Sequence, residues 1–174
     1  MEKLALFEQK MNVTFRDKAL LREAFTHRSY INETRERGLD HNERLEFLGD
    51  AVVELVVTDF LYKKYPTANE GELTSYRAAL VNAVTLGDLA IAMGMEEFLL
   101  LSKGEAKDKG TKARQIILAN AFEAVVGAIY LDQGYDVVKS FLMRFVMPRL
   151  SEVLEKKLYK DPKSLFQEEA QERV

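Results

Sequence analysis

Apolar residues recur along most of this chain at spacings of three and four, which places their side chains on one face of an α-helix. The pattern predicts helices over residues 4–11, 17–25, 40–64, 71–92, 114–132 and 135–158. Asp40 and Glu43 have the spacing of a capping box at the start of the third helix. Gly94 is expected to end the fourth helix, and Pro148 to kink the last. Because the alternating pattern of strands is missing, the sequence predicts an all-α fold.

Two of these helices are apolar on almost every side, yet each carries one stripe of polar side chains. In the helix over 40–64 the stripe falls within roughly 80° of arc and consists of Glu43, Glu46, Asp50 and Glu54. In the helix over 114–132, Asn120 and Glu123 lie three residues apart. Like charges at this spacing repel one another, and the repulsion costs far more where water is scarce. Each stripe must therefore face either solvent or a cation.

Gly49 and Gly127 lie beside the two stripes, where a missing side chain lets two helices approach closely. Face-to-face packing would gather four oxygen-bearing side chains, those of Glu46, Asp50, Asn120 and Glu123. Oxygen donors without histidine or cysteine suit Mg²⁺ or Mn²⁺. Spacing alone leaves simpler interpretations open: Glu43 as a helix cap, Asn120 as a buried amide, and Glu123 as the partner of an arginine.

Composition places the chain among globular proteins of one domain. It has 174 residues, 47% of them hydrophobic and 30% charged, and it contains no cysteine. No run approaches the roughly 18 apolar residues of a membrane span, and the N-terminus lacks the layout of a signal peptide. We therefore expect a cytoplasmic protein without a membrane partner. The net charge of −3 argues against a protein that coats nucleic acid over its whole surface.

A local basic region is still present in the polar segment over residues 102–114. It holds five cationic side chains, Lys103, Lys107, Lys109, Lys112 and Arg114, against the carboxylates of Glu105 and Asp108. Contact with RNA phosphates is one interpretation, because duplex RNA is recognised largely through its backbone. A flexible solvated loop is the other. Arg77, on the predicted helix over 71–92, is a second candidate for RNA contact.

Four motifs resemble the ribonuclease III family, the endonucleases that cut double-stranded RNA. They are, in family order, "THRSYINE", "HNERLEFLGDAV", "EGELTSYRAALVN" and "ILANAFEAVVGAIYLDQGY". The resemblance covers essentially residues 4–158, so residues 1–158 are interpreted as the endonuclease domain. Residues 159–174 are interpreted as a linker and the first helix of a double-stranded-RNA-binding domain, which "DPKSLFQEEAQ" resembles.

The resemblance implies a homodimeric, Mg²⁺-dependent hydrolase of double-stranded RNA that acts in rRNA and mRNA processing, with Mn²⁺ as a possible substitute. It implies Glu46, Asp50 and Glu123 as metal ligands, with Asp50 and Glu123 most closely tied to catalysis. It assigns Glu43 and Glu70 to the same acidic valley and Phe47 to the dimer interface. The products implied carry 5′-phosphate and 3′-hydroxyl ends, with a short 3′ overhang.

One position departs from the family pattern. Asn120 stands at the fourth metal ligand, where the family typically has Asp, so the site keeps an oxygen but loses a charge. This leaves an alternative, a binding or scaffold member of the same fold with weakened catalysis. A second rival, a ferritin-like di-iron bundle, is disfavoured, because such a site needs Glu-x-x-His pairs and neither His27 nor His41 follows a Glu by three residues.

Overall fold

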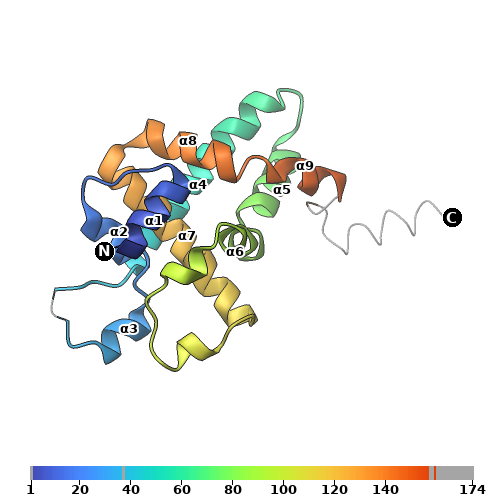
Figure 1. Cartoon of the computed structure of the whole chain (residues 1–174). Helices are drawn as coiled ribbons and strands as arrows, with labels where there is room; N and C mark the ends of the chain where they lie inside the picture. The colour runs from blue at the N-terminus through green and yellow to red at the C-terminus, as the bar shows by residue number, and fades with distance from the viewer. Residues whose placement is uncertain (1, 37, 157–158, 160–174) are drawn as a thin grey trace.

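The computed structural model describes residues 2–36, 38–156 and 159, and within them the chain is a bundle of α-helices (Figure 1). The elements are α1 (Glu2–Met11), α2 (Lys18–Ala24), α3 (Arg28–Glu33), α4 (Glu43–Lys64), α5 (Glu70–Val81), α6 (Ala83–Ala92), the 3₁₀ turns η1 (Met95–Phe98) and η2 (Glu105–Lys107), α7 (Lys112–Gln133), α8 (Tyr135–Phe145) and α9 (Arg149–Glu155). The described residues form no strand and only one isolated bridge, between Thr26 and Leu100. The predicted all-α class is confirmed.

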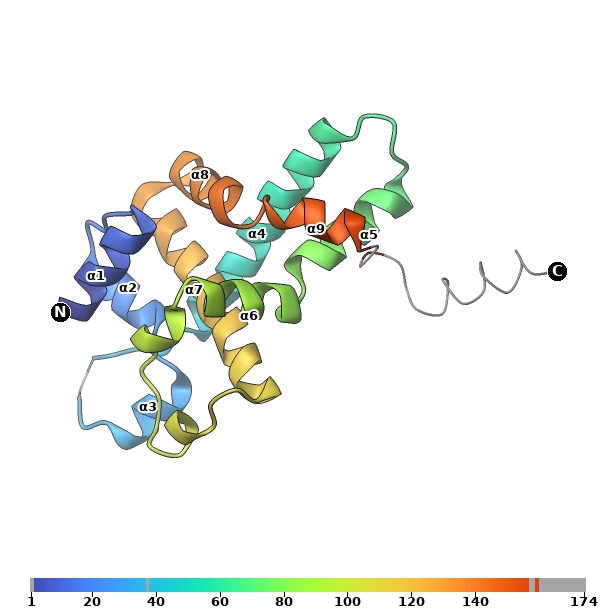
Figure 2. The same ribbon diagram turned by 45° about the vertical axis from the view of Figure 1, so that its right-hand side comes forward.

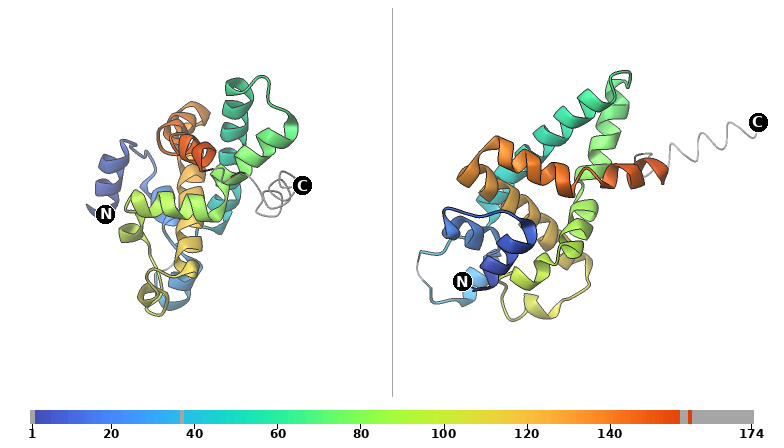
Figure 3. Two further views of the ribbon diagram at one scale, coloured as in Figure 1. Left: turned by 90° about the vertical axis from the view of Figure 1, so that its right-hand side faces the viewer. Right: turned by 45° about the horizontal axis from the view of Figure 1, so that its top comes forward.

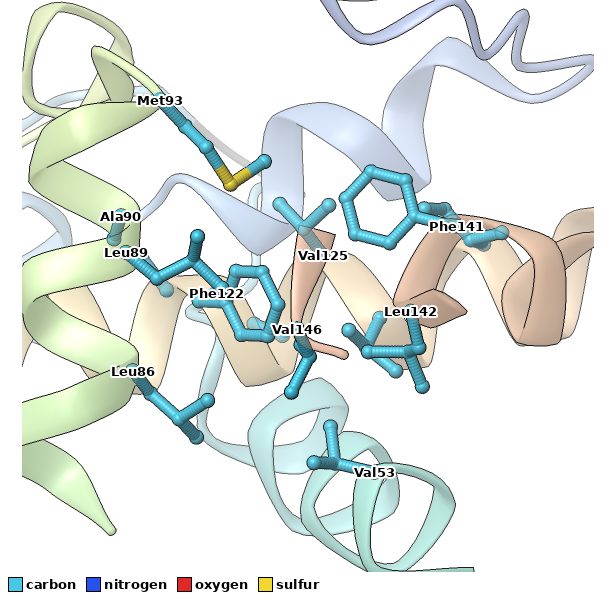
Figure 4. Packing of buried hydrophobic residues seen from close by; sticks show 14 of the residues in the cluster. Val53, Leu86, Leu89, Ala90, Met93, Phe122, Val125, Phe141, Leu142 and Val146 are labelled. Carbon is cyan, nitrogen blue, oxygen red and sulfur yellow. The ribbon is translucent and has the colours of Figure 1, made fainter. Parts of the chain in front are cut away.

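Helix α7 runs through the middle of the molecule, with α4 and α6 packed against it on different sides (Figure 2). Phe122 and Val125 of α7 lie in the core between the apolar side chains of α6 and α8 (Figure 4). Val53 of α4 extends the same cluster. Because α7 is enclosed in this way, its buried positions cover every direction except the stripe that carries Asn120 and Glu123.

Among the described residues, α7 alone also has the length and apolar character of a membrane-crossing helix. Its 18-residue window has a mean hydropathy of 1.3, and 61% of that window is buried inside the fold. The core helix of a globular protein has the same two properties. In the sequence, Gln115, Asn120 and Glu123 interrupt the apolar run of this helix.

Two helix boundaries differ from those predicted. Helix α4 begins at Glu43, and Asn42 precedes it without a side-chain cap, so the capping box expected at Asp40 and Glu43 is wrong. The Asn42 side chain is buried and donates a hydrogen bond to the Ala24 carbonyl at 3.2 Å instead. A local capping pattern was here overridden by a tertiary contact.

The helix predicted over 71–92 is divided at Asn82, whose backbone is extended. The Asn82 side chain accepts a hydrogen bond from the Thr85 amide, so it caps α6 at the point where α5 ends. The capping box that does form pairs Asn69 with Glu72 at the start of α5. Asparagine inside an apolar period was the signal that the prediction overlooked.

The other predicted helices are confirmed with bounds that differ by one or two residues: α2 is shorter at both ends, whereas α1 begins earlier and α7 is longer at both ends. Gly94 adopts the left-handed conformation that ends α6, with φ of 70°. The last predicted helix is split into α8 and α9 beside Pro148, and α9 packs on α5 (Figure 3). The predicted segment of an RNA-binding domain lies, apart from Tyr159, outside the described residues.

Candidate active site

The polar stripes of α4 and α7 meet where the two helices cross. A methyl group on Gly49 would overlap the Glu123 carbonyl oxygen, and one on Gly127 would overlap the carbonyl of Leu45. The helix backbones are therefore in direct contact, which only glycine at these two positions allows. The close approach predicted from Gly49 and Gly127 is confirmed, and it places Glu123 beside the acidic stripe of α4.

Glu123 is the most perturbed carboxyl group of this site. Burial raises its pKa to about 8, and the nearby carboxylates of Asp50 and Glu46 act in the same direction. A carboxyl group whose pKa is raised toward neutrality by burial and by like charges is a recognised mark of a functional site. The core residue Phe122, next to Glu123 in sequence, is fully buried, so α7 holds Glu123 rigidly at the edge of the bundle.

The pKa of Glu46 is raised as well. Burial raises its pKa first, Glu43 and Asp50 raise it further, and a hydrogen bond from the Asn120 side chain lowers it. Asp50 is exposed one turn further along α4. The structure thus brings Glu46, Asp50, Asn120 and Glu123 to one region of the α4–α7 crossing.

The donor chemistry of this region fits a hard divalent cation. Its side chains offer oxygen atoms, and the charge of its carboxylates is uncompensated, since no lysine or arginine is among the causes of the Glu123 and Glu46 shifts. Mg²⁺ binds to one or two carboxylates and keeps several waters. Within the described chain, no three Asp, Glu or His side chains lie close enough to hold an ion as they stand. An ion would draw them together against their mutual repulsion.

Glu43 and Glu70 take different places. Glu43 forms an exposed ion pair with Arg28 at 3.4 Å, and its carboxylate lies 3.8 Å from the His41 ring, at the start of α4. Glu70 lies at the other end of α4, where its carboxylate accepts a hydrogen bond from Thr74 at 3.1 Å. Tyr62 of α4 lines the same pocket as Glu70. Along the helix axis, Tyr62 is about 18 Å from Asp50. Within one chain, therefore, Glu70 does not join the carboxylates around Glu123.

Phe47 is the most exposed large apolar residue in the described chain. Its side chain is 82% exposed, although it follows Glu46 directly on α4. Leu55 and Tyr62 continue an exposed apolar stripe along the same helix, at 56% and 71%. A stripe of this kind indicates a surface that another molecule covers.

A pocket of about 430 Å³ lies at the far end of α4. It is lined by Thr58, Leu61, Tyr62, Ala68, Glu70, Leu73, Thr74 and Arg77. Arg77 is half-buried there and donates a hydrogen bond to the Thr58 hydroxyl at 3.1 Å. Arg77, the second candidate for RNA contact, therefore lies beside Glu70 and away from the basic segment.

The basic segment between η1 and α7 lies beside α3 at the opposite end of the fold (Figures 1 and 2). Lys103, Lys107, Lys109 and Lys112 are exposed. Arg114 is only 3% exposed, so counting it with the solvent-facing cations was wrong. The sequence contained a signal for this position: Arg114 precedes Ile117 and Leu118 by three and four residues, a spacing that places all three on one face of α7, and Ile117 and Leu118 are both buried.

The sequence and the fold of this chain are both similar to those of known proteins. The family model described as Ribonuclease-III-like matches residues 17–150. Ribonuclease 3 of Bacillus cereus (strain AH820) is 48% identical over 151 residues, which is 87% of this chain and 61% of that protein. The chain thus spans about three fifths of the length of the curated relatives it matches.

Solved structures give the same result. The nuclease domain of ribonuclease III from Campylobacter jejuni is 38% identical with a TM-score of 0.75, over 86% of this chain and 97% of that one. A second structure of that domain, described for structural flexibility in a region involved in dimer formation, is 39% identical with a TM-score of 0.72, over 80% of this chain and 93% of that one.

Proposed function

Because the chain belongs to the ribonuclease III family, we propose that it is an endoribonuclease that hydrolyses double-stranded RNA at the α4–α7 crossing. The observation that carries this proposal is the half-buried carboxyl group of Glu123 beside Asp50 and Glu46, with its pKa raised to about 8. The products proposed carry 5′-phosphate and 3′-hydroxyl ends. A role in rRNA and mRNA processing in the cytoplasm rests on the family alone.

Glu46, Asp50, Glu123 and the amide oxygen of Asn120 are proposed to hold Mg²⁺, with Mn²⁺ as a substitute. When bound, such an ion supplies an activated water and stabilises the charge of the phosphoryl transition state. The protein supplies the positions: the contact at Gly49 fixes Glu123 against α4, and Asn120 orients the Glu46 carboxylate by a hydrogen bond. Asp50 and Glu123 are the residues we assign to catalysis.

RNA binding is assigned to the exposed lysines Lys103, Lys107, Lys109 and Lys112 and to Arg77. Cationic side chains contact phosphates without reading sequence, which suits recognition of a duplex by its shape. The acidic cluster itself repels phosphate unless cations offset its charge, so these separate basic residues are needed to hold the substrate.

We propose that the chain acts as a homodimer. Phe47 and the pocket that holds Glu70 lie at opposite ends of α4. Two antiparallel copies of α4 about a twofold axis would place each Phe47 in the pocket of the other chain, the isologous arrangement usual for dimers. The same arrangement brings Glu70 of each chain toward the acidic cluster of its partner, which one chain alone does not achieve.

Phe47→Ala is expected to dissociate the dimer. Truncating a fully buried aromatic costs roughly 3–5 kcal/mol, and the twofold axis applies that loss twice. Sedimentation at micromolar concentration should show a monomer for Phe47→Ala and a dimer for Val84→Ala, a control that removes another exposed apolar side chain, on α6. A wild-type protein that sediments as a monomer would contradict the proposed interface.

Asn120 favours the second candidate function, a family member whose catalysis is weakened. Asn120→Asp adds a charged oxygen to the proposed ligand set, and hard cations favour such donors. We expect the Mg²⁺ concentration for half-maximal cleavage to fall by about 10- to 100-fold, the range that changes around metal ligands produce. Gln9→Glu, which adds the same charge on the exposed face of α1, should leave the titration unchanged.

Superimposable Mg²⁺ titrations for wild type and Asn120→Asp would show that Asn120 is not a ligand.

The function itself is tested by incubating the chain with duplex RNA, single-stranded RNA and duplex DNA, each with Mg²⁺ and with a chelator. The proposed enzyme cleaves only the duplex RNA and only with the metal. Binding of duplex RNA without cleavage would favour the scaffold alternative.

A further inference from the structure

The basic segment over residues 102–111 is tied down at its start. The Ser102 amide donates to the Ser29 hydroxyl at 3.0 Å, and the Lys103 amide donates to the Glu33 carboxylate at 2.9 Å. Both acceptors belong to α3, 70 or more residues earlier in the chain. The Ser102 hydroxyl in turn accepts from the Glu105 amide at 3.2 Å. The start of the segment therefore follows α3 instead of moving freely in solvent.

A buried arginine holds its other end. The Arg114 guanidinium donates to the backbone carbonyl of Glu105, and a second nitrogen lies 3.7 Å from the carboxylate of Glu96 in η1. The Arg114 side chain is 4% exposed, and among the described residues neither its Nε nor the Glu96 oxygen that faces it has a hydrogen-bond partner. A small pocket of about 230 Å³ at this point is lined by both Glu96 and Lys109.

Burying a guanidinium is costly unless its charge is paired and its donors are used. Arg114 meets this requirement only in part: its charge lies 3.7 Å from one carboxylate, and one of its nitrogens donates to a loop carbonyl. The loop carbonyl belongs to Glu105, the first residue of the η2 turn, and the same oxygen accepts from the Asp108 amide that closes the turn. The charge on Arg114 is thus coupled to one conformation of the basic segment.

We propose that Arg114, paired with Glu96, is a positioning residue that fixes the 102–111 segment so that Lys103, Lys107 and Lys109 together contact the RNA backbone. This inference rests on the proposed function and deepens it by naming what orders the RNA-binding surface. Arg114 itself touches no phosphate, because it is buried behind the segment. Its contribution is to hold the lysines in one arrangement before RNA arrives, which lowers the ordering cost of binding.

The test compares Arg114→Met with wild type in duplex-RNA binding and cleavage. Affinity and KM should weaken by about tenfold or more, since charge-assisted phosphate contacts are lost. The rate at saturating RNA should stay within about twofold, because the cluster at Glu123 lies elsewhere on α7. The slope of log affinity against log salt should fall by about one for each lost phosphate contact. Trypsin should cut after Lys107 and Lys109 faster than in wild type.

Arg149→Met is the matched control. Arg149 forms an ion pair with Glu152 at 3.3 Å on α9 and is not part of the basic segment. It should leave affinity, salt slope and trypsin cleavage of the segment unchanged. Arg114→Lys, which keeps a charge for Glu96 but lacks the guanidinium fork, should recover part of the affinity.

A double-substitution cycle separates positioning from a general loss of stability. Neutralising Lys107 and Lys109 together should weaken RNA binding strongly in wild type and much less in Arg114→Met. Equal effects in both backgrounds would overturn the proposal, as would an Arg114→Met protein with faster trypsin cleavage and unchanged affinity. If Arg114→Met does not fold, Arg114→Lys carries the same test, because it keeps a charge facing Glu96 and removes the guanidinium nitrogen that donates to Glu105.

Failure of the proposed function gives a different result from failure of this inference. A chain that is not a ribonuclease would leave duplex RNA uncleaved in wild type, whether or not it binds the duplex. An incorrect role for Arg114 would leave an active wild type, with Arg114→Met indistinguishable from it in salt slope and KM.

Discussion

Glu123→Gln is expected to lower the rate of duplex-RNA cleavage by at least about 100-fold, the upper range for groups that only surround metal ligands. The substitution keeps the size of the side chain and removes its charge, so the helix packing around Gly49 is unchanged. Single-turnover cleavage at saturating Mg²⁺ measures the effect. Glu155→Gln, an exposed carboxylate at the end of α9, is the control and should cleave at the wild-type rate.

The same substitution should make the metal-free protein more stable in mildly alkaline solution. The pKa of Glu123 is about 8 in the folded protein against an ordinary value of 4.5. Between these pH values the unfolded chain gives up a proton that the folded chain keeps, so the stability of the wild type falls as the pH rises. Glutamine cannot ionise, and Glu123→Gln should therefore lose much of this dependence.

Thermal midpoints measured in chelator from pH 5 to pH 9 provide the check. The two proteins should melt at similar temperatures near pH 5, and the variant should gain on the wild type up to about pH 8. Mg²⁺ at pH 8 should raise the midpoint of the wild type by binding only the folded state, and should have little effect on the variant. Parallel pH curves would show that Glu123 ionises normally, and the proposed site would then lose its main support.

Gly49→Ala is expected to destabilise the fold by about 3 kcal/mol or more, at or beyond the usual cost of overpacking. The added methyl group would overlap the backbone carbonyl of Glu123, which no rotamer change can relieve. Helices α4 and α7 would have to separate, and the carboxylates at their crossing would move apart with them. Urea unfolding followed by circular dichroism measures the loss.

Gly71→Ala is the matched control, a glycine in α5 whose added methyl group would approach only the Asn69 side chain, at 3.3 Å. Alanine has a better helix propensity than glycine by up to about 1 kcal/mol, so this variant should equal or exceed the wild type in stability. Gly127→Ala should resemble Gly49→Ala, because its methyl group would overlap the Leu45 carbonyl. A Gly49→Ala protein as stable as Gly71→Ala would contradict the close crossing.

Periodicity alone determined the all-α class and the existence of α4 and α7, because helices this long and apolar are specified by their own side-chain pattern. It also identified the carboxylates of α4 and the glycines beside them, which together predicted the crossing. The chemistry of the site was readable because its residues are close in sequence, within 46–50 and 120–123.

Tertiary structure decided everything that depends on contacts between distant segments. Asn42 is drawn into a buried bond with Ala24, so α4 starts later than its local capping pattern predicted. Propensity describes a segment in isolation, and such bonds form only when another part of the chain arrives.

The largest difference concerns charge. In the sequence, Arg114 is one of five cations in a polar segment, and Glu123 is an ordinary carboxylate. In the fold, Arg114 is buried behind that segment. Glu123 has a pKa of about 8, because burial and two neighbouring carboxylates disfavour its charged form. The sequence names the ionisable groups, but their energies depend on burial and neighbours, and those exist only once α4 and α7 have packed together.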